Sequence, residues 1–296
     1  MRVFDPTQLS FLGLRQREPT LEAPTSQLCT QGQFREPIYA HWCNVIKETP
    51  KLHRKQWEFV YMLQVLMRNG MLATGRRGLG FGCGREPLAA VMAQHGCHVV
   101  ATDLAAASAA GRGWIETEQH AAALEDLNER GICDPDAFRE RVRFRAEDMN
   151  AISADLRGFD FVWSSCAFEH LGSIAHGIKF VENAMQCLAP GGIAVHTTEF
   201  NLTSNYRTIE SPDLVVFRKH DIEHLIHRLT AAGHKVLSLN LNPGSGELDR
   251  YVDLPPYKKD PHLRLELGGY VLTSIGLVVR CAGGGNWLNT NPGRAP

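Results

Sequence analysis

Short apolar runs alternate with amphipathic stretches from residue 75 onward, and this alternation predicts strands that alternate with helices. Five apolar runs have the length and flanking turns of strands, at 77–81, 98–102, 142–145, 159–164 and 193–198. Amphipathic stretches predict helices at 87–95, 114–130, 178–188 and 221–232. Strands and helices in this order are typical of an α/β fold, in which a parallel sheet is covered by helices on both faces.

The two ends of the chain have different patterns. Residues 1–36 are rich in Pro, Gln, Thr and Glu without a sustained period, whereas 38–69 is helical with a break at Thr49-Pro50. Two apolar runs after the fifth strand predict further strands at 234–241 and 274–281. We therefore expect an N-terminal arm and helical cap over 1–70, one main domain over 71–282, and a flexible tail over 283–296.

Composition narrows the class of protein. The 296 residues are 44% hydrophobic and 21% charged, which is close to the average for globular proteins. Lys and Arg number 31 and Asp and Glu number 32, so a broad polybasic surface for nucleic acid or membrane is not expected. No apolar run approaches the about 18–20 residues that span a bilayer, and the first residues do not resemble a secretory signal. The eight cysteines form no C-x-x-C pair, so we expect reduced thiols in a cytoplasmic protein.

A glycine-rich turn follows the first predicted strand of the main domain and precedes a helix. Residues 78–87 read GLGFGCGREP, which fits neither the Gly-Lys-Ser/Thr of a P-loop nor the G-x-G-x-x-G of a dinucleotide site. Asp103 ends the next strand, where a carboxylate can accept two hydrogen bonds from a ribose diol. Together the turn and the acid predict a site for a nucleoside-containing cofactor.

These motifs resemble those of class I S-adenosylmethionine-dependent methyltransferases over roughly residues 75–200. The Asp148 segment, the fourth strand FDFVWSS and the turn LAPGG before the fifth strand also match that family. The resemblance implies a doubly wound, mostly parallel seven-stranded Rossmann-like sheet with an antiparallel last strand, and S-adenosyl-L-methionine as cofactor. It assigns cofactor binding to Gly80, Gly82, Cys83, Gly84, Glu86, Asp103, Leu104, Asp148, Met149 and Ser165.

One position departs from the family pattern. The family usually has an acid two residues before the Gly-Cys-Gly, and this chain has Gly80 there. Either Glu86 or a residue of the N-terminal arm can supply the missing carboxylate, and the sequence does not decide between them.

The segment after the fourth strand carries the candidate catalytic residues. It resembles the Glu-x-x-Glu-His metal motif of ubiquinone-pathway and small-RNA 2′-O-methyltransferases, with Cys166 in place of the first Glu. The resemblance implies a divalent metal ion held by Glu169, His170 and His220, with Glu199 or His196 as further ligands. The alternative is a metal-free site in which Glu169 and a histidine, His170 or His196, carry the chemistry. A structural role is also open, because Glu169-His170 can cap a helix.

We expect O-methylation of a small-molecule or sugar hydroxyl, with a small molecule or glycan as acceptor and no membrane partner. A metal-dependent RNA 2′-O-methyltransferase and a non-catalytic S-adenosylmethionine-binding module are the alternatives. A contiguous basic stripe from Arg54, Lys55, Arg218 and Lys219 would favour the RNA enzyme, since phosphate contacts need positive charge.

Overall fold

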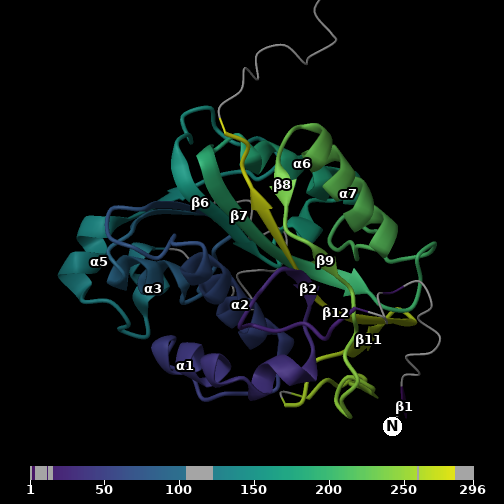
Figure 1. Cartoon of the computed structure of the whole chain (residues 1–296). Helices are drawn as coiled ribbons and strands as arrows, with labels where there is room; N and C mark the ends of the chain where they lie inside the picture. Colours follow the sequence, from purple (N-terminus) through teal and green to yellow (C-terminus); the bar gives the residue numbers. More distant parts are fainter. Residues whose placement is uncertain (1, 4–11, 13–15, 105–122, 259, 284–296) are drawn as a thin grey trace, which may run out of the picture.

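A central, mostly parallel sheet organises the computed structural model, which describes residues 2–3, 12, 16–104, 123–258 and 260–283 (Figure 1). Its main strands lie in the order β5 (Val142–Ala146), β4 (His98–Asp103), β3 (Arg77–Phe81), β6 (Phe159–Ser165), β7 (Leu188–Asn201) and β12 (Tyr270–Arg280). The first five are parallel, and β12 is antiparallel to β7. The chain runs outward from β3 to β5 and then returns to β6, so the topological switch point lies between β3 and β6, where open α/β sheets bind ligands.

The sheet has more strands than the seven expected, and the additional strands lie at the β12 edge. The predicted strand 234–241 is divided into β8 (Lys235–Val236), which pairs with β12, and β9 (Leu239–Asn240), which pairs with β2 (Ser26–Leu28). The division has a local cause, because β2 itself pairs with β12 and displaces the chain from that strand. With β11 (Leu265–Leu267) on β12, the sheet has ten strands among the described residues. A separate two-stranded sheet joins β1 (Arg2–Val3) to β10 (Tyr251–Val252).

Helices cover both faces of the sheet, as expected for the doubly wound class. The helices are α1 (Pro37–Val45), α2 (Arg54–Arg68), α3 (Leu88–Gln94), α5 (Pro135–Arg141), α6 (Ile174–Met185) and α7 (Lys219–Ala231), with short 3-10 turns at η2 (Gln31–Arg35), η3 (Leu124–Asn128) and η4 (Phe168–His170). Helix α6 begins four residues before the predicted start because the Ser173 hydroxyl caps it by accepting from the backbone N–H of His176. Residues 114–122 of the predicted helix 114–130 lie outside the described residues. Residues 284–296 of the predicted tail also lie outside them.

The core is divided between the two faces of the sheet. Helices α1, α2 and α3 pack on one face against side chains such as Phe161 and Trp163, and α6 and α7 pack on the other against Val162 (Figure 1). Because successive strand residues point to opposite faces, both faces of β6 and β7 are apolar. No helix among the described residues is long and apolar enough to cross a membrane.

Helix α2 lies directly on the sheet. It contacts β6, β7 and β12, and the Trp57 and Tyr61 rings stack with their centroids 4.7 Å apart. Gly276 of β12 permits this approach, since a Cβ there would stand 2.1 Å from the Tyr61 ring. This packing brings the polar start of α2 to the carboxyl ends of β6 and β7.

Candidate cofactor and active site

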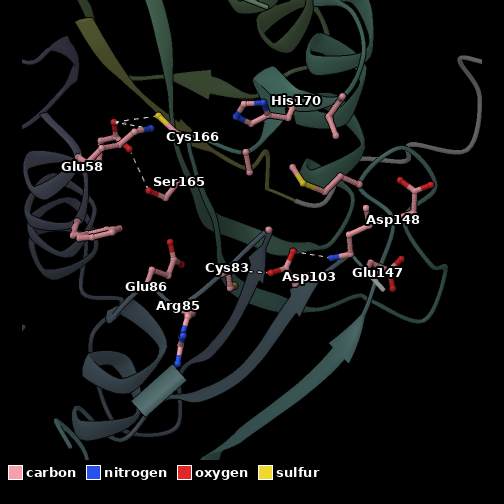
Figure 2. Close-up of a pocket in the computed structure, with 18 of the residues that line it drawn as sticks. Glu58, Cys83, Arg85, Glu86, Asp103, Glu147, Asp148, Ser165, Cys166 and His170 are labelled. Carbon is pink, nitrogen blue, oxygen red and sulfur yellow. Dashed lines mark hydrogen bonds and ion pairs between the residues drawn. The ribbon is translucent and has the colours of Figure 1, made fainter. Parts of the chain in front are cut away.

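A cavity of about 420 Å³ lies at the carboxyl ends of β3, β4 and β6, at the switch point of the sheet (Figure 2). Nine of the ten residues predicted to bind cofactor line it: Gly82, Cys83, Gly84, Glu86, Asp103, Leu104, Asp148, Met149 and Ser165. Glu58, Ser165 and Glu86 lie on one side of the cavity in this view, and Asp103 and Asp148 on the other. The predicted residues thus border one space, although their role in binding stays a prediction.

Asp103 holds the glycine turn against the end of β4. Its carboxylate accepts hydrogen bonds from the backbone N–H of Gly84 (3.1 Å) and of Leu104 (2.7 Å). The turn itself needs glycine, because Gly82 and Gly84 have φ of 59° and 50° and a Cβ on Gly82 would lie 2.7 Å from the Ala167 Cβ. The result is a bare backbone turn beside an acid, which fits a ligand that carries a ribose diol.

Gly80 does not line the cavity. A Cβ at this position would stand 2.3 Å from the Trp163 ring and 2.4 Å from the Cys83 sulfur. The space that the family's acid side chain would need is therefore filled by Trp163, which is fully buried. Gly80 packs closely against Trp163 and is not among the residues that line the cavity, so its role in cofactor binding stays a prediction.

Two carboxylates are present where the motif acid is missing. Glu86 lines the cavity, and its Oε1 accepts a 2.6 Å hydrogen bond from the Trp163 indole. Burial raises the pKa of Glu86 well above its usual value, while the Trp163 hydrogen bond lowers it. Glu58 of α2 also lines the cavity, so both the nearby acid and one from the N-terminal region reach it.

Asp148 and its neighbour Glu147 differ in their surroundings. Asp148 is exposed and accepts from the backbone N–H of Asn150 at 2.8 Å. Glu147 is buried and is engaged by Arg145 and Ser153. Of the two acids, Asp148 is the one whose carboxylate is accessible at the cavity.

His170 lies on η4 with its ring directed toward the cavity (Figure 2). Its Nδ1 is 2.6 Å from the carbonyl oxygen of Asp213. Because a carbonyl only accepts, Nδ1 carries a proton, and Nε2 is the acceptor atom of the neutral ring. This tautomer suits His170 to take a proton from a hydroxyl group.

His196 lies elsewhere. It is fully buried among the Phe168 and Phe180 rings, and its Nδ1 is 2.7 Å from the Ser164 hydroxyl. Burial lowers the pKa of His196 to about 3. The alternation of β7 explains the placement: Val195 faces α2 and α3, so His196 points to the opposite side of the sheet. Its candidate role as a base at the cavity does not fit this position.

Glu169 is also withdrawn from the cavity. It is fully buried, one carboxylate oxygen accepts from the Thr198 hydroxyl at 3.1 Å, and burial raises its pKa. Its neighbours are Cys166 and Glu199, with one ligand atom of each residue within 4.8 Å of the others. Among the described residues this is the one such group, and neither His170 nor His220 belongs to it.

The expected metal set is therefore not assembled. His220 sits at the start of α7, where Nδ1 faces the Asn205 carbonyl at 2.5 Å and Nε2 faces Asp221 at 3.1 Å. Positive charge near Glu199 is already supplied by Arg54, at 2.6 Å, and by Lys55, at 3.7 Å. The residues present do not fit the divalent ion that the motif resemblance implies.

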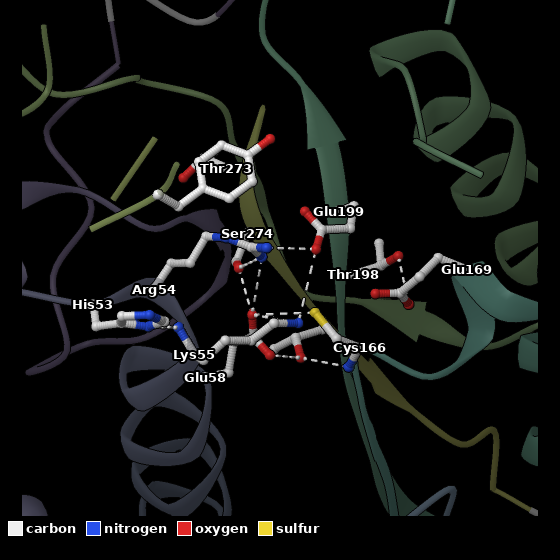
Figure 3. A network of polar contacts seen from close by, with 12 residues as sticks. His53, Arg54, Lys55, Glu58, Cys166, Glu169, Thr198, Glu199, Thr273 and Ser274 are labelled. Atoms are coloured by element: carbon white, nitrogen blue, oxygen red, sulfur yellow. Dashed lines mark hydrogen bonds and ion pairs between the residues drawn. The ribbon is translucent and has the colours of Figure 1, made fainter. Parts of the chain in front are cut away.

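Helix α2 supplies residues that the sequence motifs did not reveal. Lys55, Glu58 and Phe59 line the cavity beside the motif residues. The Glu58 carboxylate, fully buried, lies within a polar network that joins α2 to β6, β7 and β12 (Figure 3). The signal was an acid within the otherwise apolar helical segment QWEFVYML, where a charge requires partners.

Comparison with known proteins decides the family. The sequence model described as a methyltransferase domain matches residues 54–239, which is more than half of the chain. The chain belongs to this methyltransferase family. The resemblance to class I S-adenosylmethionine-dependent methyltransferases is thereby confirmed, and so is the enzyme class. No curated protein matches the chain significantly.

Several solved structures are similar to this methyltransferase. The [4+2]-cyclase SpnF is 17% identical, with 88% of this chain and 100% of SpnF covered at a TM-score of 0.50. An S-adenosylmethionine-dependent methyltransferase from Mesorhizobium loti is 15% identical over 73% of this chain and 95% of its own, at a TM-score of 0.45. The structure of the DhpI–SAH complex is 16% identical, with 73% of this chain and 80% of DhpI covered at a TM-score of 0.43. At 17% identity the similarity to SpnF concerns the fold alone and does not establish the acceptor.

Proposed function

We propose that this methyltransferase binds S-adenosylmethionine in the cavity at the ends of β3, β4 and β6 and methylates a hydroxyl group of a small molecule or sugar. The bound cofactor supplies an electrophilic methyl group on a sulfonium. Asp103 would hold the ribose diol, the turn at Gly82 and Gly84 would lie against the cofactor, and Asp148 would meet the adenine. These assignments rest on the carboxylate and bare backbone that border one cavity.

His170 carries the proposal of oxygen as the accepting atom. A hydroxyl must lose its proton as it accepts a methyl group, so a base within reach contributes to the rate. His170 borders the cavity, and the Asp213 carbonyl fixes the tautomer whose Nε2 accepts a proton. This arrangement favours O-methylation over methyl transfer to an acceptor atom that needs no base.

The ion pairs of the basic residues favour a small acceptor over RNA. Arg54 and Lys55 contact Glu199, Arg218 contacts Asp221 at 2.8 Å, and Lys219 contacts Glu223 at 3.6 Å. Carboxylates thus neutralise the residues that a basic stripe would use. RNA binding depends on releasing counterions from phosphates to unneutralised Lys and Arg, so these pairs count against it.

A labelled-methyl transfer screen tests the proposal. Wild-type protein is incubated with labelled S-adenosylmethionine and sets of hydroxylated metabolites, glycans and RNA, and we expect transfer to a member of the first two sets. His170→Gln should lower the transfer rate about 100-fold or more while cofactor affinity is retained, because a base contributes roughly 10²–10⁴ to the rate. His224→Gln, an exposed histidine of α7, is the matched control.

Three results would contradict the proposal in different ways. Transfer to RNA alone would support the RNA alternative. Cofactor binding without transfer to any acceptor would support a non-catalytic module. Full activity of His170→Gln would leave the acceptor open and remove His170 as the base.

A further inference from the structure

An unusual backbone conformation occurs where β6 ends at the cavity. Cys166 directly follows Ser165 and has φ of 43°, a left-handed value that residues with a Cβ seldom adopt. Ser165, Cys166 and Ala167 all line the cavity, so this turn forms part of its wall. The Ala167 Cβ lies where a side chain on Gly82 would begin, which places the turn against the glycine loop.

Hydrogen bonds from two directions hold this turn. The Cys166 N–H donates to the Thr197 carbonyl at 3.0 Å and to the Thr197 hydroxyl at 3.2 Å. The Thr197 hydroxyl donates in turn to Glu58 at 3.3 Å. The Cys166 thiol and the Ser165 hydroxyl also donate to Glu58, at 3.1 Å and 3.3 Å. The side chains of Ser165, Cys166 and Thr197 therefore all donate to one carboxylate of α2, and Figure 3 shows the Cys166 thiol beside it.

The setting of Glu58 keeps that carboxylate in place. It is fully buried, and Arg54 and Lys55 lie 3.6 Å and 3.7 Å from it on the same helix. The Ser274 hydroxyl of β12 donates to it from outside the turn. A buried carboxylate with two cations and four donors is strongly fixed, because each lost partner leaves a buried polar atom unpaired.

We propose that Glu58 is a positioning residue that holds residues 165–167 in their left-handed turn and thereby shapes the cofactor side of the cavity. Glu58 need not touch the cofactor to do this. The part that concerns cofactor affinity rests on the proposed function, because it assumes that S-adenosylmethionine binds this cavity. The part that concerns the turn depends only on the contacts of Glu58.

A mutant cycle at residues 58 and 166 tests the inference. Glu58→Gln keeps the shape of the side chain but removes its charge and half of its acceptor oxygens. The substitution is made in wild type, in Cys166→Ala and in Cys166→Gly, and S-adenosylmethionine affinity is measured by calorimetry. Alanine lacks the thiol but keeps the Cβ that disfavours positive φ, whereas glycine adopts positive φ readily.

The expected losses of affinity distinguish an effect on the backbone of residue 166 from an effect of its thiol. Glu58→Gln should weaken cofactor binding about tenfold or more in wild type, the scale of one lost charge-assisted hydrogen bond. A loss of similar size should persist in the Cys166→Ala background, and it should fall to less than about threefold in the Cys166→Gly background. Ser274→Ala, which removes a donor to the same carboxylate from β12, should change affinity less than about threefold. An equal loss in the alanine and glycine backgrounds would overturn the inference.

Melting temperatures measured without cofactor test the role of Glu58 separately from the proposed function. The melting temperature lost through Glu58→Gln should be smaller in Cys166→Gly than in Cys166→Ala, whether or not S-adenosylmethionine binds. Wild type that fails to bind S-adenosylmethionine would refute the proposed function, whereas equal melting losses would refute the role of Glu58. If Glu58→Gln does not fold, Thr197→Val replaces it in the cycle with the same expectations, since it removes the hydroxyl that links the Cys166 N–H to Glu58.

Discussion

Gly80→Ala is the simplest test of how the glycine strand meets β6. The added Cβ would stand 2.3 Å from the Trp163 ring and 2.4 Å from the Cys83 sulfur, more than 1 Å inside the ordinary contact distance of about 3.5–4 Å. Trp163 is fully buried and Cys83 is 2% exposed, so buried side chains must shift to relieve the overlap.

The cost follows from this overlap. Overpacking a buried site typically costs about 1–3 kcal/mol, and contact with two rigid neighbours places Gly80→Ala near 2 kcal/mol. For a domain of about 150–250 residues this corresponds to a fall in melting temperature of roughly 4–8 °C. Cofactor affinity should fall as well, because a displaced Trp163 ring moves the indole that donates to Glu86.

Urea denaturation and thermal melting measure the effect, with Gly283→Ala as the matched control. A Cβ at Gly283 meets no atom within 4 Å, and this glycine has no positive φ, so the control should be near neutral. If Gly80→Ala matched wild type in both stability and cofactor affinity, Trp163 would not occupy the space of a side chain at position 80.

Two further predictions concern buried charge. Arg54→Met should lower the free energy of unfolding by about 3–5 kcal/mol in urea denaturation, because it leaves the buried Glu199 without its partner at 2.6 Å. The control Arg228→Met removes an exposed ion pair and should cost about 0–1 kcal/mol. Equal losses in the two variants would contradict the prediction. His196 should make the protein sensitive to acid, since the unfolded imidazole binds a proton below a pKa of 6.5 and the folded one only near about 3. Stability should therefore be lost as pH falls through this window, by about 1.4 kcal/mol per pH unit for this group, and His196→Gln should flatten the profile; an unchanged profile would contradict the neutral buried ring.

The cofactor side of the site was readable from sequence because its residues lie in local motifs. The turn GLGFGCG, Asp103 at a strand end and Asp148 after the next strand each follow a parallel strand, and carboxyl ends of parallel strands meet at one edge of a sheet. The order of strands and helices then brings them together without any knowledge of distant contacts.

His170 stays the candidate base, whereas the positions of His196 and of the predicted metal ligands differ from those expected. His196 lies in a strand that is apolar on both faces, so the hydrophobic pattern gave no indication of which face the ring occupies. The motif resemblance placed a metal near Glu169, but Arg54, over 100 positions earlier in the chain, supplies positive charge to Glu199. Contacts at such separation follow from the packing of α2 and cannot be read from spacing.

The last strand and Glu58 show the same limit. The last strand was predicted from residue 274, whereas β12 begins at Tyr270. Two small residues within it, Ser274 and Gly276, are explained by the hydrogen bond to Glu58 and by the close Tyr61 ring. Glu58 is an acid in an amphipathic helix, and its partners in β6, β7 and β12 are more than 100 residues away. The sequence analysis did not single out Glu58, and the packing of α2 on the sheet shows what its carboxylate contacts.

We propose that S-adenosylmethionine binds at the ends of β3, β4 and β6 with its ribose at Asp103. Calorimetric titration of S-adenosylmethionine into wild type and Asp103→Asn measures this directly, with Asp136→Asn on the exposed start of α5 as control. We expect saturable binding to wild type and to the control. For Asp103→Asn we expect a dissociation constant at least about tenfold higher, which corresponds to about 1.4 kcal/mol. Binding of equal affinity to all three proteins, or none to wild type, would contradict it.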